Sequence, residues 1–206
     1  SDPALVPVWA ANHPTTQFML HEFGDPFDRD DAAIVTRNLG LTRTSVEVVL
    51  AGPPCQTFSA AGKRTLTAES RYVFHVCAIA EVLQPKVVLI ENVPQFGSVL
   101  GGRLLGRVRV MLSEAGYNTA ASILSAAMHG VPQRRSRFFI LAVRKDLNYL
   151  NPSSILANCV KSRSIDIEIT AETAIGDLPP LAAGESATRY VDPPGTLYQA
   201  QMRGGE

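Results

Sequence analysis

Two short motifs carry side chains that could act together in a reaction. Cys55 follows Gly52-Pro53-Pro54, where the prolines stiffen a turn and the glycine lets the backbone bend. A thiol presented by such a turn is a candidate nucleophile, although a lone cysteine is more often a buried structural residue. Glu91 follows a run of aliphatic residues at the end of a predicted strand. Beside a nucleophile it is a candidate general acid, whose pKa its surroundings could raise.

A basic motif occurs later in the chain, where residues 133–137 lead into another predicted strand. The alternation of an extended segment places Arg135 and Arg137 on one face. Two guanidinium groups there could bind a phosphate or a polar base edge, and the alternative is a solvated edge strand. Further positive charge surrounds the cysteine motif, at Lys63, Arg64 and Arg71.

The composition excludes several classes of protein. The 206 residues include 19 basic and 19 acidic side chains, so only local clusters could attract nucleic acid. Three cysteines without a CxxC or Cys/His cluster indicate neither a disulfide framework nor a metal site. We expect reduced thiols and an intracellular location. No apolar run is long enough for a membrane span, and no signal peptide precedes the first motif.

The hydrophobic pattern predicts a doubly wound α/β sheet. Strands are expected over residues 6–11, 46–50, 86–90, 117–127 and 137–143, and helices over residues 14–23, 72–83 and 104–115. Ligands of such sheets bind beyond the carboxyl ends of the strands, so Cys55 and Glu91 should share one rim. After Asp146 the chain becomes polar and rich in turns. We therefore predict a catalytic domain over residues 1–148 and an irregular connector over residues 149–206.

The motifs, taken in order, resemble those of the DNA cytosine-5 methyltransferases. The resemblance is carried by residues 52–59, by Glu91-Asn92-Val93 and by residues 133–137, with additional similarity at residues 174–179 and 198–203. It extends from about residue 8 to residue 203. It implies a Rossmann-like fold that uses S-adenosyl-L-methionine, with DNA as the partner and no metal.

The resemblance also implies a mechanism. The Cys55 thiolate would attack carbon-6 of cytosine, which makes carbon-5 nucleophilic toward the methyl group. Glu91 would hydrogen-bond or protonate ring nitrogen 3, while Arg135 and Arg137 would hold the base and its phosphate. Carbon-5 is shielded inside a duplex, so the base must be flipped out of the helix.

The family pattern assigns further residues to DNA and to the cofactor. The loop over residues 56–71 would close over DNA, with contacts from Gln56, Ser59, Lys63, Arg64, Ser70 and Arg71. For the cofactor, Asn12 is the polar residue nearest to the position where the family carries an acid that binds the ribose. Asp30 or Asp31 would be the acid that contacts adenine. Pro53 and Phe74 are the other cofactor candidates.

Some family features have no match in this sequence. We find no Phe-x-Gly-x-Gly loop and no target-recognition domain, and we expect the first strand to be missing, so that the chain starts at about the second. We expect such a chain to be inactive alone, to bind cofactor poorly and to leave the strand over residues 46–50 with an unpaired edge. The alternatives are a tRNA cytosine-5 methyltransferase, although residues 56–63 look more like the DNA enzymes, and a non-catalytic remnant or regulatory partner. A thiol-dependent hydrolase would need a histidine base for the cysteine. None of the four histidines lies in a recognisable motif, so this alternative is the least favoured.

Overall fold

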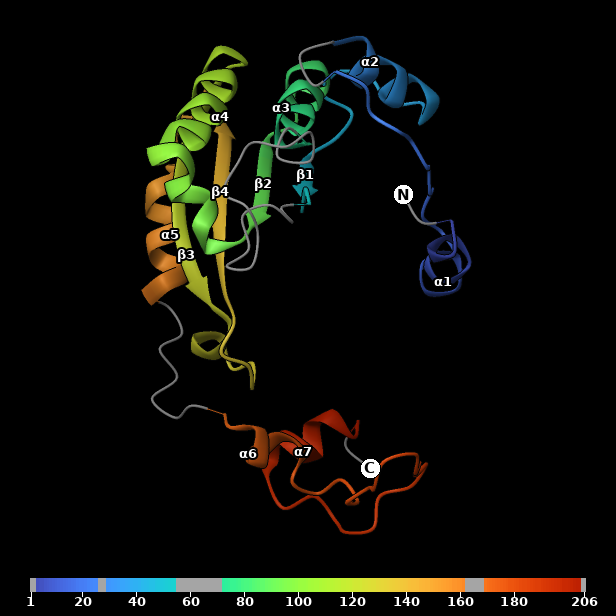
Figure 1. Cartoon of the computed structure of the whole chain (residues 1–206). Coiled ribbons are helices and arrows are strands. Elements are labelled where there is room, and N and C mark those ends of the chain that lie inside the picture. The colour runs from blue at the N-terminus through green and yellow to red at the C-terminus, as the bar shows by residue number, and fades with distance from the viewer. Residues whose placement is uncertain (1–2, 26–28, 55–71, 162–168, 205–206) are drawn as a thin grey trace. The chain divides into compact units, whose positions relative to one another are not determined.

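The computed structural model describes residues 3–25, 29–54, 72–161 and 169–204. The chain divides into two compact units, the first formed by residues 1–123 and 137–158 and the second by residues 124–136 and 159–206. Most of the first unit is a sheet with helices on its faces (Figure 1). The predicted boundary at residue 148 stays a prediction.

The sheet contains four strands in the order β1-β2-β4-β3. The bounds are Val48–Ala51 for β1, Val87–Asn92 for β2, Tyr117–Ser125 for β3 and Ser136–Arg144 for β4. β1 and β2 are parallel and joined through helix α3 (Tyr72–Leu83), whereas β2 and β4 are antiparallel. The predicted α/β fold and its four strands from residue 46 onward are confirmed.

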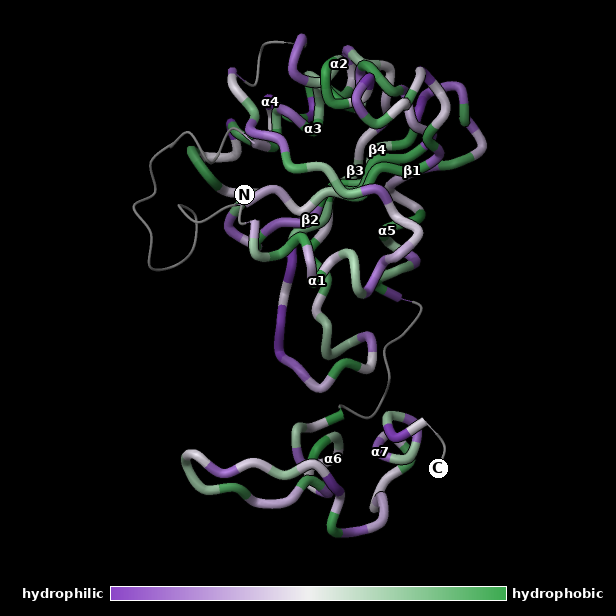
Figure 2. The backbone as a smooth tube through the Cα atoms, turned by 90° about the vertical axis from the view of Figure 1, so that its right-hand side faces the viewer, coloured by the Kyte–Doolittle hydropathy of each residue, from purple (hydrophilic) through white to green (hydrophobic). Residues whose placement is uncertain are grey.

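Apolar residues fill both faces of the sheet. Alternate residues Val88 and Ile90 of β2 pack against α3 and against α4 (Arg103–Glu114). On the other face, Leu141 and Val143 of β4 pack with Leu156 of α5 (Pro152–Lys161). Figure 2 shows green, apolar stretches among polar ones in this unit, with green tube around the labels of β1 and β4. α5 lies in the segment that we predicted as an irregular connector, and its buried leucine ties it to the sheet.

The prediction of a strand over residues 6–11 is wrong. These residues lie in helix α1 (Leu5–Asn12), and the segment over residues 14–23, predicted as a helix, contains none. A short apolar run fits a buried strand or a helix equally well, but a strand needs a partner for its backbone groups. A helix satisfies most of those groups internally, whereas Pro14 and the β-branched Thr15-Thr16 disfavour helix after it.

Three further helical segments lie before residue 136. They are α2 (Arg29–Asn38), with Asp30 and Asp31 in its first turn, and the 3-10 segments η3 (Pro94–Gly102) and η4 (Ala126–His129), of which η4 belongs to the second unit. Acidic side chains favour a helix N-terminus because they complement its dipole. α2 was not predicted from the sequence.

The second unit contains two short helices, α6 (Ala171–Ile175) and α7 (Leu197–Met202). The Thr196 side chain caps α7 and also donates a hydrogen bond to the Thr173 carbonyl of α6, at 2.8 Å. Arg203 forms an ion pair with Asp177 and lies over the Tyr190 ring, 3.6 Å from its centroid. Polar contacts, rather than an apolar core, therefore hold much of this unit.

One edge of the sheet is open within the described residues. β1 is an edge strand paired with β2 alone, as expected for residues 46–50, and Leu50 is 74% exposed. An exposed apolar strand at a sheet edge is a surface that pairs readily with another chain.

Among the helices of the described residues, none has the length and apolar character that a membrane span requires.

A buried tyrosine stabilises the end of the sheet opposite the predicted site. The Tyr117 hydroxyl donates to the Pro85 carbonyl at 2.7 Å, and the nearby Arg144 Nη1 donates to the Gln84 carbonyl at 2.6 Å. Burial raises the pKa of Tyr117 from 10.0 to about 12. The phenol therefore stays protonated in the folded chain when exposed tyrosines already ionise.

Stability should fall with rising pH above 10 because of Tyr117. Above pH 10 the unfolded chain releases a proton that the folded chain retains. The free energy of unfolding therefore decreases by up to roughly 2–3 kcal/mol by about pH 12. Tyr117→Phe should remove this alkaline loss but cost roughly 1–2 kcal/mol at pH 8, because the Pro85 carbonyl loses its donor. Urea unfolding of both proteins at pH 8 and at pH 11 measures the difference. Equal pH dependence of the two proteins would contradict the assignment.

Candidate active site

The carboxyl ends of β1 and β2 meet at one rim of the sheet. Ala51 pairs with Ile90, so the turn that follows β1 runs beside Glu91. A Cβ added to Gly52 would lie 3.8 Å from the Glu91 Oε2 atom. Cys55 itself lies outside the described residues, three positions after Gly52. Its place beside Glu91 stays a prediction, and the adjoining turn is consistent with it.

Asn92 anchors this turn from β2. Its Nδ2 donates to the Pro53 carbonyl at 3.3 Å, and its Oδ1 accepts from the Val93 N–H at 2.9 Å. The side chain is only 4% exposed. A buried amide whose donor and acceptor are both used fixes the backbone that it contacts. Sequence reasoning included Asn92 in a motif but gave it no role of its own.

Removing the Asn92 amide should loosen the Pro-Pro turn. Asn92→Ala leaves the Pro53 carbonyl without this donor, so we expect a loss of roughly 1–3 kcal/mol in the free energy of unfolding. Because the turn leads into Cys55, the methylation that the family resemblance predicts should decrease by more than the loss of stability explains. Chemical denaturation and single-turnover methylation measure the two effects. Asn38→Ala, at an exposed position of α2, should stay within about 0.5 kcal/mol of the parent, and equal behaviour of the two variants would contradict the anchoring role.

Glu91 forms an ion pair with Arg137 of β4. The Arg137 Nε and Glu91 Oε1 atoms are 2.7 Å apart, and the two side chains are 24% and 39% exposed. Glu91 lies opposite Phe139 in the antiparallel pair, so Arg137, two residues away, extends from the same face. The structure therefore brings together two of the residues predicted for catalysis. The exposed part of the carboxylate can still accept a hydrogen bond from a ligand.

The other predicted arginine belongs to the second unit. Arg135 precedes β4, and its carbonyl accepts from the Ala126 N–H at 2.8 Å. Its position relative to Glu91 stays a prediction. The predicted DNA-binding residues Gln56, Ser59, Lys63, Arg64, Ser70 and Arg71 all lie outside the described residues.

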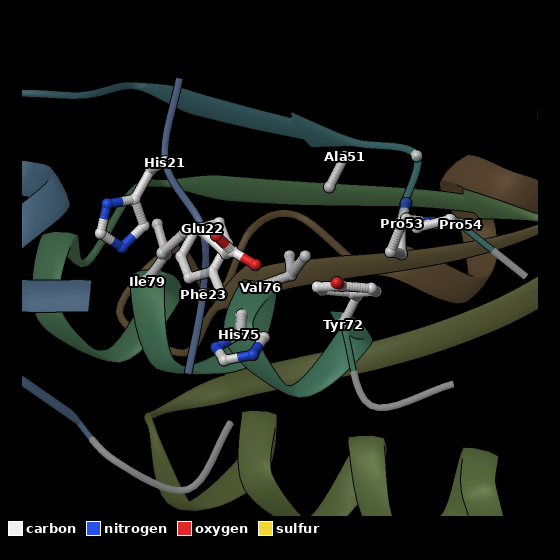
Figure 3. A pocket seen from close by; sticks show the side chains of 11 residues that line it. His21, Glu22, Phe23, Ala51, Pro53, Pro54, Tyr72, His75, Val76 and Ile79 are labelled. Atoms are coloured by element: carbon white, nitrogen blue, oxygen red, sulfur yellow. The ribbon is translucent and has the colours of Figure 1, made fainter. Parts of the chain in front are cut away.

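A cavity of about 440 Å³ borders the opposite side of the same turn. Its wall has three parts, namely the segment over residues 21–23, the end of β1 with residues 51–54, and α3 (Figure 3). The turn before Cys55 thus lies between this cavity and the Glu91 side chain. Glu91 and Arg137 do not line the cavity itself.

Aromatic rings and polar groups meet in this cavity. The Phe23 and His75 rings are tilted against each other with centroids 4.6 Å apart, and Tyr72 lies 6.0 Å from His75. Burial lowers the pKa of His75, so its imidazole is neutral at pH 7. Figure 3 shows the Glu22 carboxylate among these side chains. Such a wall suits a flat heterocycle that carries an amino group, which stacks on the rings and donates to the carboxylate.

Of the cofactor residues predicted from the sequence, some line this cavity and others lie elsewhere. Pro53 lines it, whereas Phe74, a residue of α3, is buried in the core. Asn12 lies at the end of helix α1, where its Nδ2 donates to the Val8 carbonyl at 2.8 Å. The strand that suggested Asn12 as a ribose ligand is therefore absent. Asp30, on α2, is not among the residues that line the cavity.

Sequence reasoning missed five residues of the wall, His21, Glu22, Phe23, Tyr72 and His75. The first three fell in the helix that we wrongly predicted over residues 14–23. Tyr72 and His75 follow the loop that we predicted to contact DNA. Two ring-bearing side chains at the start of a predicted helix were the sequence feature that could have identified them. Cys77 of α3 is buried, and burial raises the pKa of its thiol to about 12, which makes that thiol inert.

The sequence profile of the C-5 cytosine-specific DNA methylases matches residues 3–193. The chain belongs to this family. It is 32% identical to the Type II methyltransferase M.AgeI of Thalassovita gelatinovora over 98% of the chain and 50% of that protein. It is 37% identical to M.HhaI of Haemophilus parahaemolyticus over 51% of the chain and 33% of that protein. The chain thus spans half or less of the length of these relatives.

Solved structures show the same fold. A prophage-encoded DNA modification methyltransferase of Escherichia coli superimposes with a TM-score of 0.64 and 24% identity, over 87% of this chain and 47% of that one. DNMT2 of Spodoptera frugiperda superimposes with a TM-score of 0.50 and 23% identity, over 71% of this chain and 41% of that one. At these identities the likeness establishes the methyltransferase fold alone.

Proposed function

We propose that the protein carrying this chain methylates carbon-5 of cytosine in DNA. The observation that carries the proposal is the position of the Gly52–Pro54 turn, between the Glu91–Arg137 pair and an aromatic cavity. This reaction needs a nucleophile, an acid and a cofactor close to the same cytosine ring. Family membership supplies the reaction type, and the geometry supports the roles of the individual residues.

In this proposal Cys55 attacks carbon-6 of a cytosine that has left the duplex. Glu91 hydrogen-bonds ring nitrogen 3 and offsets the negative charge that develops on the ring. Arg137 holds the Glu91 carboxylate and places a positive charge near the base. Once carbon-5 carries the methyl group, loss of its proton and release of the Cys55 thiolate restore the aromatic ring. Arg135 and the basic residues over 56–71 are proposed to contact the DNA.

S-adenosyl-L-methionine, when bound, supplies the methyl group as an electrophile. We assign its adenosyl part to the cavity beside the turn, where Phe23, Tyr72 and His75 offer flat surfaces and Glu22 a hydrogen-bond acceptor. The volume of about 440 Å³ lies within the usual range for small-molecule sites.

The proposal is tested with the protein expressed from its complete reading frame and with the 206-residue chain alone. Each is incubated with labelled cofactor and either duplex DNA or tRNA, and 5-methylcytosine is measured by mass spectrometry. We expect methylated DNA from the complete protein and little from the chain alone. Methylated tRNA would indicate the RNA-modifying alternative, and cofactor binding without transfer to either substrate would indicate a non-catalytic partner.

A further inference from the structure

Helix α4 begins at the rim of the sheet that carries the candidate active site. β2 ends at Asn92, and η3 follows after a single residue. The Phe96 ring of η3 packs against Phe138 of β4, with centroids 5.9 Å apart, and Phe138 is the pairing partner of Asn92. Gly102, the residue before α4, closes back on η3, since a Cβ added there would lie 3.6 Å from the Gly97 carbonyl oxygen. The first turn of α4 is therefore held near the end of β2.

Two exposed arginines of α4, Arg103 and Arg107, form what we call the α4 arginine pair. They are four residues apart, so both side chains extend from one side of the helix. Leu104 and Val108 are buried in the core instead. The Arg103 Nε donates to the Leu100 carbonyl at 3.1 Å, which uses one of the five guanidinium donors. The pair therefore presents two positive charges beside the rim.

The positions of the α4 arginine pair do not favour the helix itself. A positive charge in the first turn opposes the helix dipole, and α4 has no acidic residue there. Like charges one turn apart also repel each other. Residues 93–113 include three arginines and no acid, although the whole chain carries equal numbers of basic and acidic side chains. A solvated surface ordinarily mixes both signs, so this local excess of positive charge indicates an anionic partner.

We propose that the α4 arginine pair binds the phosphate backbone of the DNA substrate. This inference rests on the proposed function, in which the flipped cytosine approaches Glu91 at the same rim. Guanidinium groups form paired, charge-assisted hydrogen bonds with phosphate oxygens. Contacts of this kind position a duplex without reading its sequence. The pair therefore contributes affinity for duplexes of any sequence and holds them against the rim.

The same helix supplies a matched control for this role. Arg103→Gln and Arg107→Gln each remove one charge and keep a side chain that favours helix. Arg109→Gln removes the same charge from α4. Arg109 is also exposed, but two residues along a helix turn the side chain through about 200°, so it extends from the side opposite Arg107. Arg103→Lys keeps the charge and loses the planar guanidinium.

The test measures the Kd of the complete protein for two duplexes of unrelated sequence, from about 50 to about 200 mM salt. Each Gln variant of the pair should weaken binding of both duplexes roughly fivefold at about 150 mM salt, because one phosphate contact is lost. The slope of log K against log salt concentration should become shallower by about 0.9 for each lost contact, and by about twice that in the double variant. Arg103→Lys should retain the wild-type slope, and Arg109→Gln should behave as wild type. Because these positions are exposed, every variant should unfold within about 2 °C of wild type.

An unchanged salt slope in the folded double variant would overturn the inference, and so would an equal change of slope in Arg109→Gln. If the double variant does not fold, the single variants decide in the same way. A wild-type protein that binds duplexes through the pair but methylates no cytosine would refute the proposed function and leave the inference intact. Tighter binding of tRNA than of duplex DNA, with the same losses in the Gln variants, would assign the phosphates to RNA and overturn the DNA contact.

Discussion

Replacing Cys55 with serine should abolish covalent trapping of the enzyme by DNA that contains 5-fluorocytosine. Fluorine at carbon-5 blocks the proton loss that normally releases the adduct, so a sulfur–carbon bond accumulates. A serine hydroxyl is far less ionised than a thiol at neutral pH and hardly attacks carbon-6. A denaturing gel that separates the protein–DNA complex from free protein reads the result directly.

A second cysteine provides the control for this experiment. Cys159 is a half-buried residue of α5 and belongs to no predicted motif. Cys159→Ser should leave trapping unchanged. Trapping that survives in Cys55→Ser, or that never occurs in the wild type, would refute Cys55 as the nucleophile.

Glu91→Gln should slow methylation by roughly two to four orders of magnitude, the range for loss of a general acid. The amide oxygen of glutamine can still accept from Arg137 Nε, which lies 2.7 Å from the present carboxylate. The fold should therefore survive while proton transfer and negative charge are lost. Single-turnover methylation at saturating cofactor and DNA measures the chemical step.

Glu47→Gln is the matched control, because Glu47 also pairs with a cation at 2.8 Å, the Lys86 ammonium. That pair is exposed and lies before β1, whereas Glu91 follows the aliphatic run of β2. Exposed ion pairs contribute little, so Glu47→Gln should keep both stability and rate. A Glu91→Gln rate within a few-fold of wild type would exclude Glu91 as the catalytic acid.

The central sheet could be predicted because its sequence pattern is strong. The apolar spacing over residues 72–83 and the following Pro85 define α3 with the bounds that the structure shows. Four consecutive aliphatic residues predict β2 for the same reason. In both cases local propensity and burial favour the same structure.

The candidate site was less accessible to sequence reasoning because its parts meet only through tertiary structure. Glu91 and Arg137 were each found from their strands, but their contact depends on β4 lying beside β2, a strand order that no local pattern encodes. Phe23 belongs to an irregular segment, and its role follows from the approach of that segment to α3. The helix predicted there followed apolar spacing alone, without a partner surface to test it.

Glu91 and Asn92, the two consecutive polar residues of β2, make this strand more tolerant of substitutions than of insertions or deletions. Asn92 lies on the face with Ile90, toward α3, and Glu91 lies on the face with Leu89, toward α5. Inserting or deleting one residue within β2 would exchange those faces, since side chains alternate along a strand. Arg137 would lose its partner and Pro53 its anchor in one event. Over evolutionary time this strand can accept aliphatic exchanges at Val88 or Leu89, but its length is fixed by two neighbours that need opposite sides of it.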